Sequence, residues 1–306
     1  MTVVNALSLG DEGIVVADEQ SSNQLRKYNV AQKLHLLNDS FIYGGSGVSD
    51  QIQEVYTMIA GELTKAKEQK DDIPLEEVYR IAKGVLTNHH NSLKNEVLAM
   101  NLGISLDDLL TGVHLRTGRP LHESAMAAGR KILQSIDEQC AMSILLSGLQ
   151  DGKFNIYQIN TNNGGSCLSR PYGSIGSGAD ESDKVLSGYV ESLPREKREA
   201  IDKKEGVVKI IQATNASSSL NVGVGGSPSI AYVTKEKEII IPTEQQSILA
   251  SEIVKGLTNG LLDKDFAEDA VFRLVFNTQV EQVEDEMKKA AKDWPKLNRI
   301  LRGYKS

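Results

Sequence analysis

The sequence predicts an α+β fold in which antiparallel sheets are layered with helices. The expected elements run as strands, then helices, strands, helices and strands, so they do not alternate steadily as β, α, β. Grouped strands and grouped helices favour antiparallel sheets covered by helical layers. The 306 residues are 40% hydrophobic, which is enough to bury a large core. Two sheets between two helical layers would fit this order, although the pattern alone does not choose that arrangement.

The first fifty residues are β-prone. A turn signal, Asp11–Gly13, separates Thr2–Leu9 from the apolar run Ile14–Ala17. A second turn at Asn38 and Asp39 separates two further expected strands, and a glycine cluster follows them. These two strands are Lys33–Leu37 and Phe41–Tyr43, and the cluster is Gly44, Gly45, Ser46 and Gly47.

Helical spacing begins at Asp50 and continues to about Lys67. The apolar positions recur at the spacing of one helix face: Ile52, Val55, Tyr56, Ile59 and Leu63. Pro74 suits the first turn of the next helix, where a missing N–H does no harm. The stretch 92–138 is also mostly helical in pattern, and Ser105, with Asp108, and Ser124 are predicted N-caps.

The second half returns to strands and ends in helices. Strands are expected at Ala141–Leu149, Phe154–Ile159, Ile230–Val233 and Glu238–Ile241. Helices are expected at about Glu181–Ser192 and Lys204–Ala216. Gly173–Gly178 is interpreted as a glycine-rich segment, 217–229 as a loop, and 245–306 as helical, with apolar surface to pack on the core or on a neighbour.

Composition excludes several functions. The net charge is −7, and no basic patch indicates a nucleic-acid partner. Cys140 and Cys167 are isolated, and the five histidines lie in no metal-binding spacing, so we expect no cofactor and no metal. No signal peptide and no membrane-spanning run is expected. A reduced, cytoplasmic, soluble protein is the prediction.

Thr2 directly follows Met1 and is the first candidate for chemistry. Removal of Met1 would leave Thr2 with a free α-amine, whose ordinary pKa is about 7.7–8.0. The neutral amine could take the proton of the adjacent hydroxyl and so act as a general base within one residue. A threonine in second place is common, so this motif indicates a nucleophile only if the rest of the chain supports it.

Several short segments give a further signal when they are taken in order: Thr2–Val4, Gly13–Asp18, Lys33–Leu34, Gly44–Asp50, Ile73–Glu76, Ser174–Gly178, Gly188–Ser192, Glu205–Val207, Gly225–Gly226, Ile230–Thr234 and Ile241–Gln245. In this order they resemble the proteasome β subunits and the related bacterial peptidase subunit that works with a ring unfoldase. The resemblance runs from Thr2 to about Gln245. Each segment is short, and their collinear order makes the signal specific.

This resemblance implies a four-layer αββα sandwich of the N-terminal-nucleophile hydrolase type. It implies Thr2 as nucleophile, Lys33 as a buried cation beside it, Asp18 as the partner of that cation, and Ser177 as a proton relay. The backbone N–H of Gly45, or of Gly47 because the loop length is ambiguous, would form the oxyanion hole. Asn221 falls where the family has an active-site aspartate, and Val224 falls where it has a serine.

The resemblance therefore predicts a threonine-type peptidase that acts on peptide or protein substrates. A homo-oligomeric ring and an ATP-dependent unfoldase are the implied partners. Residues 2–245 would form the hydrolase domain, with a helical insertion at about 92–138, and 246–306 would form a helical extension. Two alternatives stay open: a hydrolase or transpeptidase for a special amide substrate, and a non-catalytic structural subunit.

Overall fold

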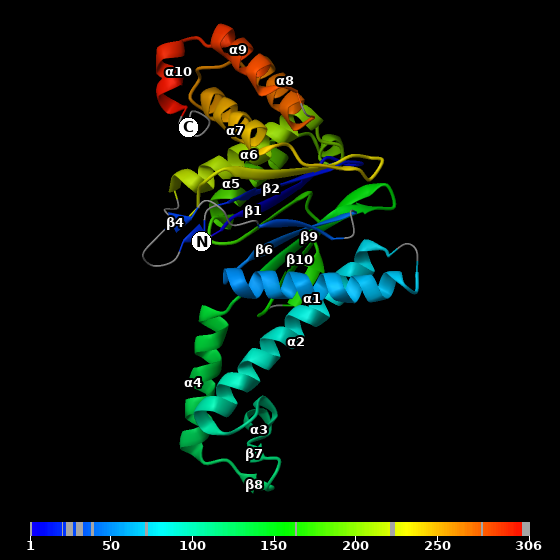
Figure 1. Ribbon diagram of the computed structural model, residues 1–306, viewed down its shortest axis with the longest axis vertical. Helices are drawn as coiled ribbons and strands as arrows, with labels where there is room; N and C mark the ends of the chain where they lie inside the picture. The colour runs from blue at the N-terminus through cyan, green and yellow to red at the C-terminus, as the bar shows by residue number, and fades with distance from the viewer. Residues whose placement is uncertain are drawn as a thin grey trace.

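A computed structural model describes residues 2–19, 21–22, 27–28, 33–37, 40–70, 73–162, 164–220, 224–276 and 278–301. The fold is α+β with antiparallel sheets, as predicted. Two five-stranded sheets form its centre, and helices surround them (Figure 1).

The first sheet contains the N-terminal strand at an inner position. Its order is β12 (Tyr172–Ile175), β1 (Val4–Ser8), β2 (Gly13–Asp18), β13 (Pro228–Val233) and β14 (Ile239–Ile240). Val4 is opposite Ala17 on one side and Ile175 on the other. The strand β12 overlaps the segment Gly173–Gly178, which was interpreted as glycine-rich and not as a strand.

The second sheet is antiparallel throughout. Its order is β11 (Gly164–Cys167), β10 (Lys153–Asn160), β9 (Ser143–Gln150), β6 (Phe41–Ser46) and β5 (Leu34–Leu37). Two further pairs are short: β3 (Ser21–Ser22) with β4 (Lys27–Tyr28), and β7 (Val113–His114) with β8 (Arg119–Pro120).

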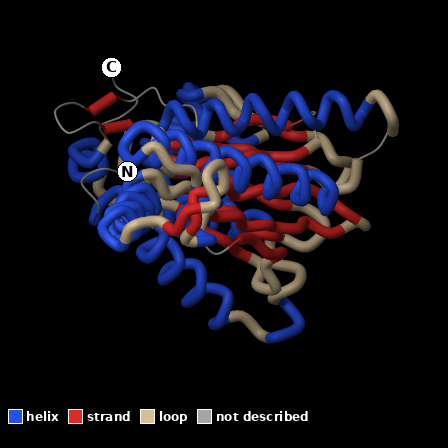
Figure 2. Tube along the Cα trace, turned by 90° about the horizontal axis from the view of Figure 1, so that it is seen from below, coloured by secondary structure: helices blue, strands red, loops and turns tan. Residues whose placement is uncertain are grey.

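Helices cover the outer faces of the sheets. The second sheet is contacted by α1 (Ser49–Lys67) and α2 (Leu75–Leu102), and the first by α5 (Ala179–Ser192) and α6 (Lys203–Leu220). A short 3₁₀ turn, η1 (Arg195–Lys197), connects α5 to α6. The inner faces of the sheets share one apolar cluster, which includes Val4, Ile42 and Ala231. Figure 2, from below, shows the strands in the interior of the view with helices in front of and around them.

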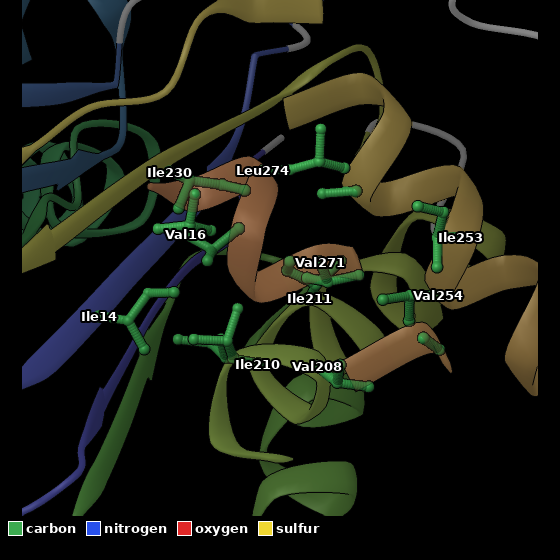
Figure 3. Packing of buried hydrophobic residues seen from close by; sticks show 14 of the residues in the cluster. Ile14, Val16, Val208, Ile210, Ile211, Ile230, Ile253, Val254, Val271 and Leu274 are labelled. Atoms are coloured by element: carbon green, nitrogen blue, oxygen red, sulfur yellow. The ribbon is translucent and has the colours of Figure 1, made fainter. Parts of the chain in front are cut away.

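The C-terminal helices belong to the core of the first sheet. They are α7 (Glu244–Thr258), α8 (Lys264–Val275), α9 (Val280–Ala290) and α10 (Trp294–Ile300). Val16 of β2, Ile211 of α6, Ile253 of α7 and Val271 of α8 lie in one buried cluster (Figure 3). The sequence left open whether this segment packs on the core or on a neighbour. The structure shows that it packs on the core of its own chain.

An arm of the structure extends away from the sheets (Figure 1). The helix α2 continues past residue 92 without a break and is followed by α3 (Leu106–Thr111), the β7–β8 pair and α4 (Glu123–Gln139). Ser105 caps α3 in a capping box with Asp108, as predicted. The N-cap prediction at Ser124 is wrong: His122 caps α4, and its side chain accepts the N–H of Ser124.

Within the described ranges, no helix combines the length and the apolar character needed to cross a lipid bilayer.

Candidate active site

Thr2 and Ser177 meet at the end of the first sheet. Thr2 lies two residues before the start of β1 and is 7% exposed, and Ser177 lies two residues after the end of β12, which pairs with β1. The backbone nitrogen of Thr2 donates to Oγ of Ser177 at 3.1 Å. The N–H of Gly178 donates to the carbonyl oxygen of Thr2 at 3.2 Å. The chain around Ser177 therefore holds both backbone groups of Thr2.

Gly176 allows this close approach. A Cβ at position 176 would overlap the carbonyl oxygen of Thr2, and the residue has a φ of +99°, which L side chains rarely adopt. The same Cβ would also lie 3.2 Å from Oγ of Ser46, so the end of β6 reaches this point as well. The turn between β12 and α5 thus requires glycine next to Thr2.

Asp18 and Lys33 form a buried ion pair beside the Thr2–Val3 peptide bond. Nζ of Lys33 lies 2.8 Å from Oδ1 of Asp18, and the two residues are 6% and 1% exposed. The same Oδ1 accepts the backbone N–H of Val3 at 2.8 Å. Because both donors share one oxygen, the Lys33 ammonium lies next to the backbone that carries Thr2.

The carboxylate of Asp18 has donors at both of its oxygens. Its second oxygen, Oδ2, accepts the N–H of Gly225 at 3.1 Å. Sequence reasoning did not assign this donor to the site, although Gly225 and Gly226 were recognised as a segment of the resemblance. Two backbone N–H groups and an ammonium therefore hold this carboxylate in one orientation.

The pKa of the Lys33 ammonium lies below that of an ordinary lysine. Burial is the main cause, because it disfavours the charged form, and the charge and hydrogen bond of Asp18 act in the opposite direction. Lys33 is therefore a cation that loses its proton more readily than a surface lysine does. A lysine of this kind is common at sites that move protons.

The two candidate oxyanion donors differ in their hydrogen bonds. The N–H of Gly45 donates to the carbonyl oxygen of Lys33 at 3.3 Å, as part of the pairing between β5 and β6. In this geometry it is not directed at a substrate. Gly47 follows the end of β6 with a φ of +143°, and its N–H donates to no acceptor among the described residues.

Of the two positions at which the sequence departs from the resembled pattern, Asn221 is outside the described residues and Val224 is described. Val224 is 3% exposed and directly precedes Gly225, so an apolar side chain is buried next to the residue that binds Asp18.

The described residues bring together no group of three or more potential metal ligands. His90 of α2, which is 2% exposed, pairs with Asp137 of α4 at 2.8 Å. The site around Thr2 consists of a hydroxyl, an ammonium, a carboxylate, a second hydroxyl and backbone N–H groups. These groups can activate an oxygen nucleophile and stabilise negative charge.

Comparison with protein-family models gives no match for this chain, and comparison with curated proteins gives none either.

Proposed function

We propose that this protein is a threonine-type amidohydrolase that cleaves peptide bonds through an acyl-enzyme on Thr2. The observation that carries the proposal is the sharing of Oδ1 of Asp18 between Val3 and Lys33. This sharing fixes an ammonium beside the peptide unit that carries the threonine. Burying two charges costs desolvation free energy, which their pairing only offsets. We therefore assign the pair a role at the site and not only in the stability of the fold.

The reaction requires cleavage of the bond between Met1 and Thr2, which turns the Thr2 nitrogen into an amine. The neutral amine accepts the hydroxyl proton of Thr2 while Oγ1 attacks the substrate carbonyl carbon. Ser177 relays protons at this nitrogen, because its Oγ is 3.1 Å away. The Lys33 ammonium lowers the pKa of the hydroxyl and stabilises the developing negative charge.

Negative charge develops on the carbonyl oxygen of the substrate when the tetrahedral intermediate forms. We assign the N–H of Gly47 as the donor to this oxygen, because the N–H of Gly45 already donates to the carbonyl oxygen of Lys33. One such donor contributes about 2.7–4 kcal/mol. The protonated α-amine then gives its proton to the leaving amine, the C–N bond breaks, and water hydrolyses the ester on Thr2.

The proposed fold assignment is the four-layer sandwich of the proteasome-like N-terminal-nucleophile hydrolases. It is supported by the two sheets with helices on their outer faces, and by the site at the start of β1. A homo-oligomeric ring, an ATP-dependent unfoldase and a cytoplasmic location belong to the same proposal. The free thiols of Cys140 and Cys167 suit a reducing compartment.

The test combines processing with covalent labelling. Intact-mass analysis is expected to show loss of Met1, and an electrophile directed at N-terminal threonine is expected to add one equivalent. The Thr2→Ala protein, with the same fold by circular dichroism, should add none. A folded, processed protein that adds no label would contradict the proposal and favour a non-catalytic subunit.

A further inference from the structure

A cavity of about 480 Å³ opens at the edge of the two sheets. Two of its lining residues, Glu19 and Leu34, directly follow Asp18 and Lys33 in the chain. Its apolar walls come from β5, β6 and β13 and from the chain before α7, and they include Leu34, Leu36, Ile42, Ala231 and Ile241. Leu34, Ile42 and Ala231 also belong to the cluster between the sheets. The cavity is therefore the open end of that interior, between the edge strands β5 and β14. Its volume suits a small organic group.

Two carboxylates, Glu19 and Glu244, line this apolar cavity. Glu19 follows β2 and is half-buried, and it accepts a hydrogen bond from the hydroxyl of Ser229. Glu244 begins α7, is exposed, and accepts one from Ser227 at 3.3 Å. Serine hydroxyls donate one bond each and bring no charge. Neither carboxylate forms an ion pair with a described residue.

The described lining of the cavity carries negative charge without a positive partner. No lysine, arginine or histidine is found among its described lining residues. Burial raises the pKa of the Glu19 carboxyl, and the hydrogen bond from Ser229 lowers it. The negative charges of Glu244 and Asp18 raise this pKa further, whereas the positive charge of Lys33 lowers it. The Lys33 ammonium is already bound to Asp18. A second positive charge placed here would relieve the repulsion between the carboxylates.

We propose that this cavity binds an alkyl chain that ends in an ammonium or guanidinium group, with the alkyl part against Leu34, Leu36 and Ile42 and the cation between Glu19 and Glu244. Leu34 and Glu19 are bonded directly to Lys33 and Asp18 in the chain, so a bound cation lies beside the proposed active site. The binding site rests on its own geometry; its part in substrate choice rests on the proposed function. The ligand is a basic side chain of the substrate or a free small amine.

The first experiment measures binding without turnover. Calorimetry with the full-length Thr2→Ala protein would compare n-hexylamine and n-butylguanidine, both cationic at pH 7, with neutral 1-hexanol. The cations are expected to bind at least about tenfold more tightly than the alcohol, because only they pair with carboxylates. Equal affinity for 1-hexanol, or no binding of either cation, would overturn the proposal.

Substitutions in the cavity identify the binding groups. Glu19→Gln and Glu244→Gln are each expected to weaken cation binding about tenfold, whereas Glu236→Gln, at an exposed carboxylate in the turn after β13, should leave it unchanged. Ile241→Lys adds a cation at a wall residue that is 57% exposed, so folding should persist while ligand binding is lost. Unchanged binding in both Glu19→Gln and Ile241→Lys would place the cations elsewhere and overturn the proposal.

Turnover separates the two sources of the cation. Processed wild-type protein would be offered matched fluorogenic peptides that carry arginine, lysine or norleucine at each position near the scissile bond. A preference for arginine and lysine that Glu19→Gln removes assigns the cavity to a substrate side chain. Cation binding without such a preference assigns it to a free amine. Absence of all turnover together with intact cation binding would contradict the proposed function and leave the cavity assignment standing.

Discussion

The Oγ atom of Ser177 lies 3.1 Å from the backbone nitrogen of Thr2, although 175 residues separate the two positions. The antiparallel pairing of β1 with β12 brings them together, since Val4 is opposite Ile175. The contact joins the first strand to the turn that begins α5. Any chemistry at the Thr2 nitrogen therefore depends on the position of that turn.

The Ser177→Ala substitution tests whether the hydroxyl relays protons. We expect the rate of Thr2 acylation to fall by about 100-fold, the low end of general acid–base contributions, while the melting temperature changes little. Stopped-flow labelling with the threonine-directed electrophile measures this rate. Ser187→Ala is the matched control, because it removes a serine hydroxyl that donates to the carbonyl oxygen of Lys184 within α5, away from Thr2. Equal rates for both variants would remove Ser177 from the mechanism.

The buried pair of Lys33 and Asp18 predicts a large stability effect. Lys33→Met leaves a carboxylate that is 1% exposed without its ammonium, which is expected to cost about 3–5 kcal/mol of unfolding free energy. Denaturant titration measures this change. In the double variant Lys33→Met with Asp18→Asn, the loss should be clearly less than the sum of the two single losses. Lys65→Met, in an exposed pair with Glu62, should leave the unfolding free energy nearly unchanged.

The rate of Thr2 labelling should follow a bell-shaped pH profile. The α-amine must be neutral to accept a proton, so the rate falls as the pH drops through about 7.7–8.0. Lys33 must be charged, so the rate falls again as the pH rises through its pKa. Burial places that pKa below the ordinary lysine value of 10.5. A rate that still increases at pH 10.5 would show that charged Lys33 is not needed.

The same shift affects stability with a defined sign. The unfolded chain binds the Lys33 proton more strongly than the folded chain does, so the unfolding free energy contributed by this group rises with pH between the folded and the unfolded pKa values. Urea unfolding of wild type and Lys33→Met across this range isolates the contribution.

Gly176 and Gly188 offer a paired test of close packing at the site. Gly176→Ala introduces a Cβ that overlaps the Thr2 carbonyl oxygen at a φ of +99°, and we expect a loss of more than about 2 kcal/mol together with slower labelling. Gly188→Ala, inside α5 with open space around its Cβ position, should stabilise the protein by about 0.5–1 kcal/mol. Thermal unfolding compares them. A tolerated alanine at position 176 would mean that Thr2 does not lie there.

The sequence predicted most elements because their apolar positions follow a clear period. Helix α1 was expected at Asp50–Lys67 and spans Ser49–Lys67, since one face carries Val55, Ile59 and Leu63 into the core. The strand β12 could not be found in this way. Gly173 occupies its inner face, where a side chain would overlap Leu168, so glycine hides the alternation that marks a strand.

The candidate site was predictable as a set of residues and not as a geometry. The resemblance placed Thr2, Asp18, Lys33 and Ser177 in one site, and no periodicity could have done so. Which glycine N–H is available was not predictable, because the register of β5 against β6 decides that the N–H of Gly45 meets the carbonyl of Lys33. Gly225 was missed as a partner of Asp18 because backbone donors leave no signature in residue type.

The sharing of one apolar cluster by β2, α6 and the last helices has a consequence for synthesis. Leu297 and Leu301 complete a cluster that begins with Leu7 and Leu9. A ribosome exposes the first of these residues long before the last leave its exit tunnel. The outer face of α6 therefore lacks its packing partners until the helices α7 and α8 have been synthesised, and the nascent chain exposes apolar surface throughout that interval.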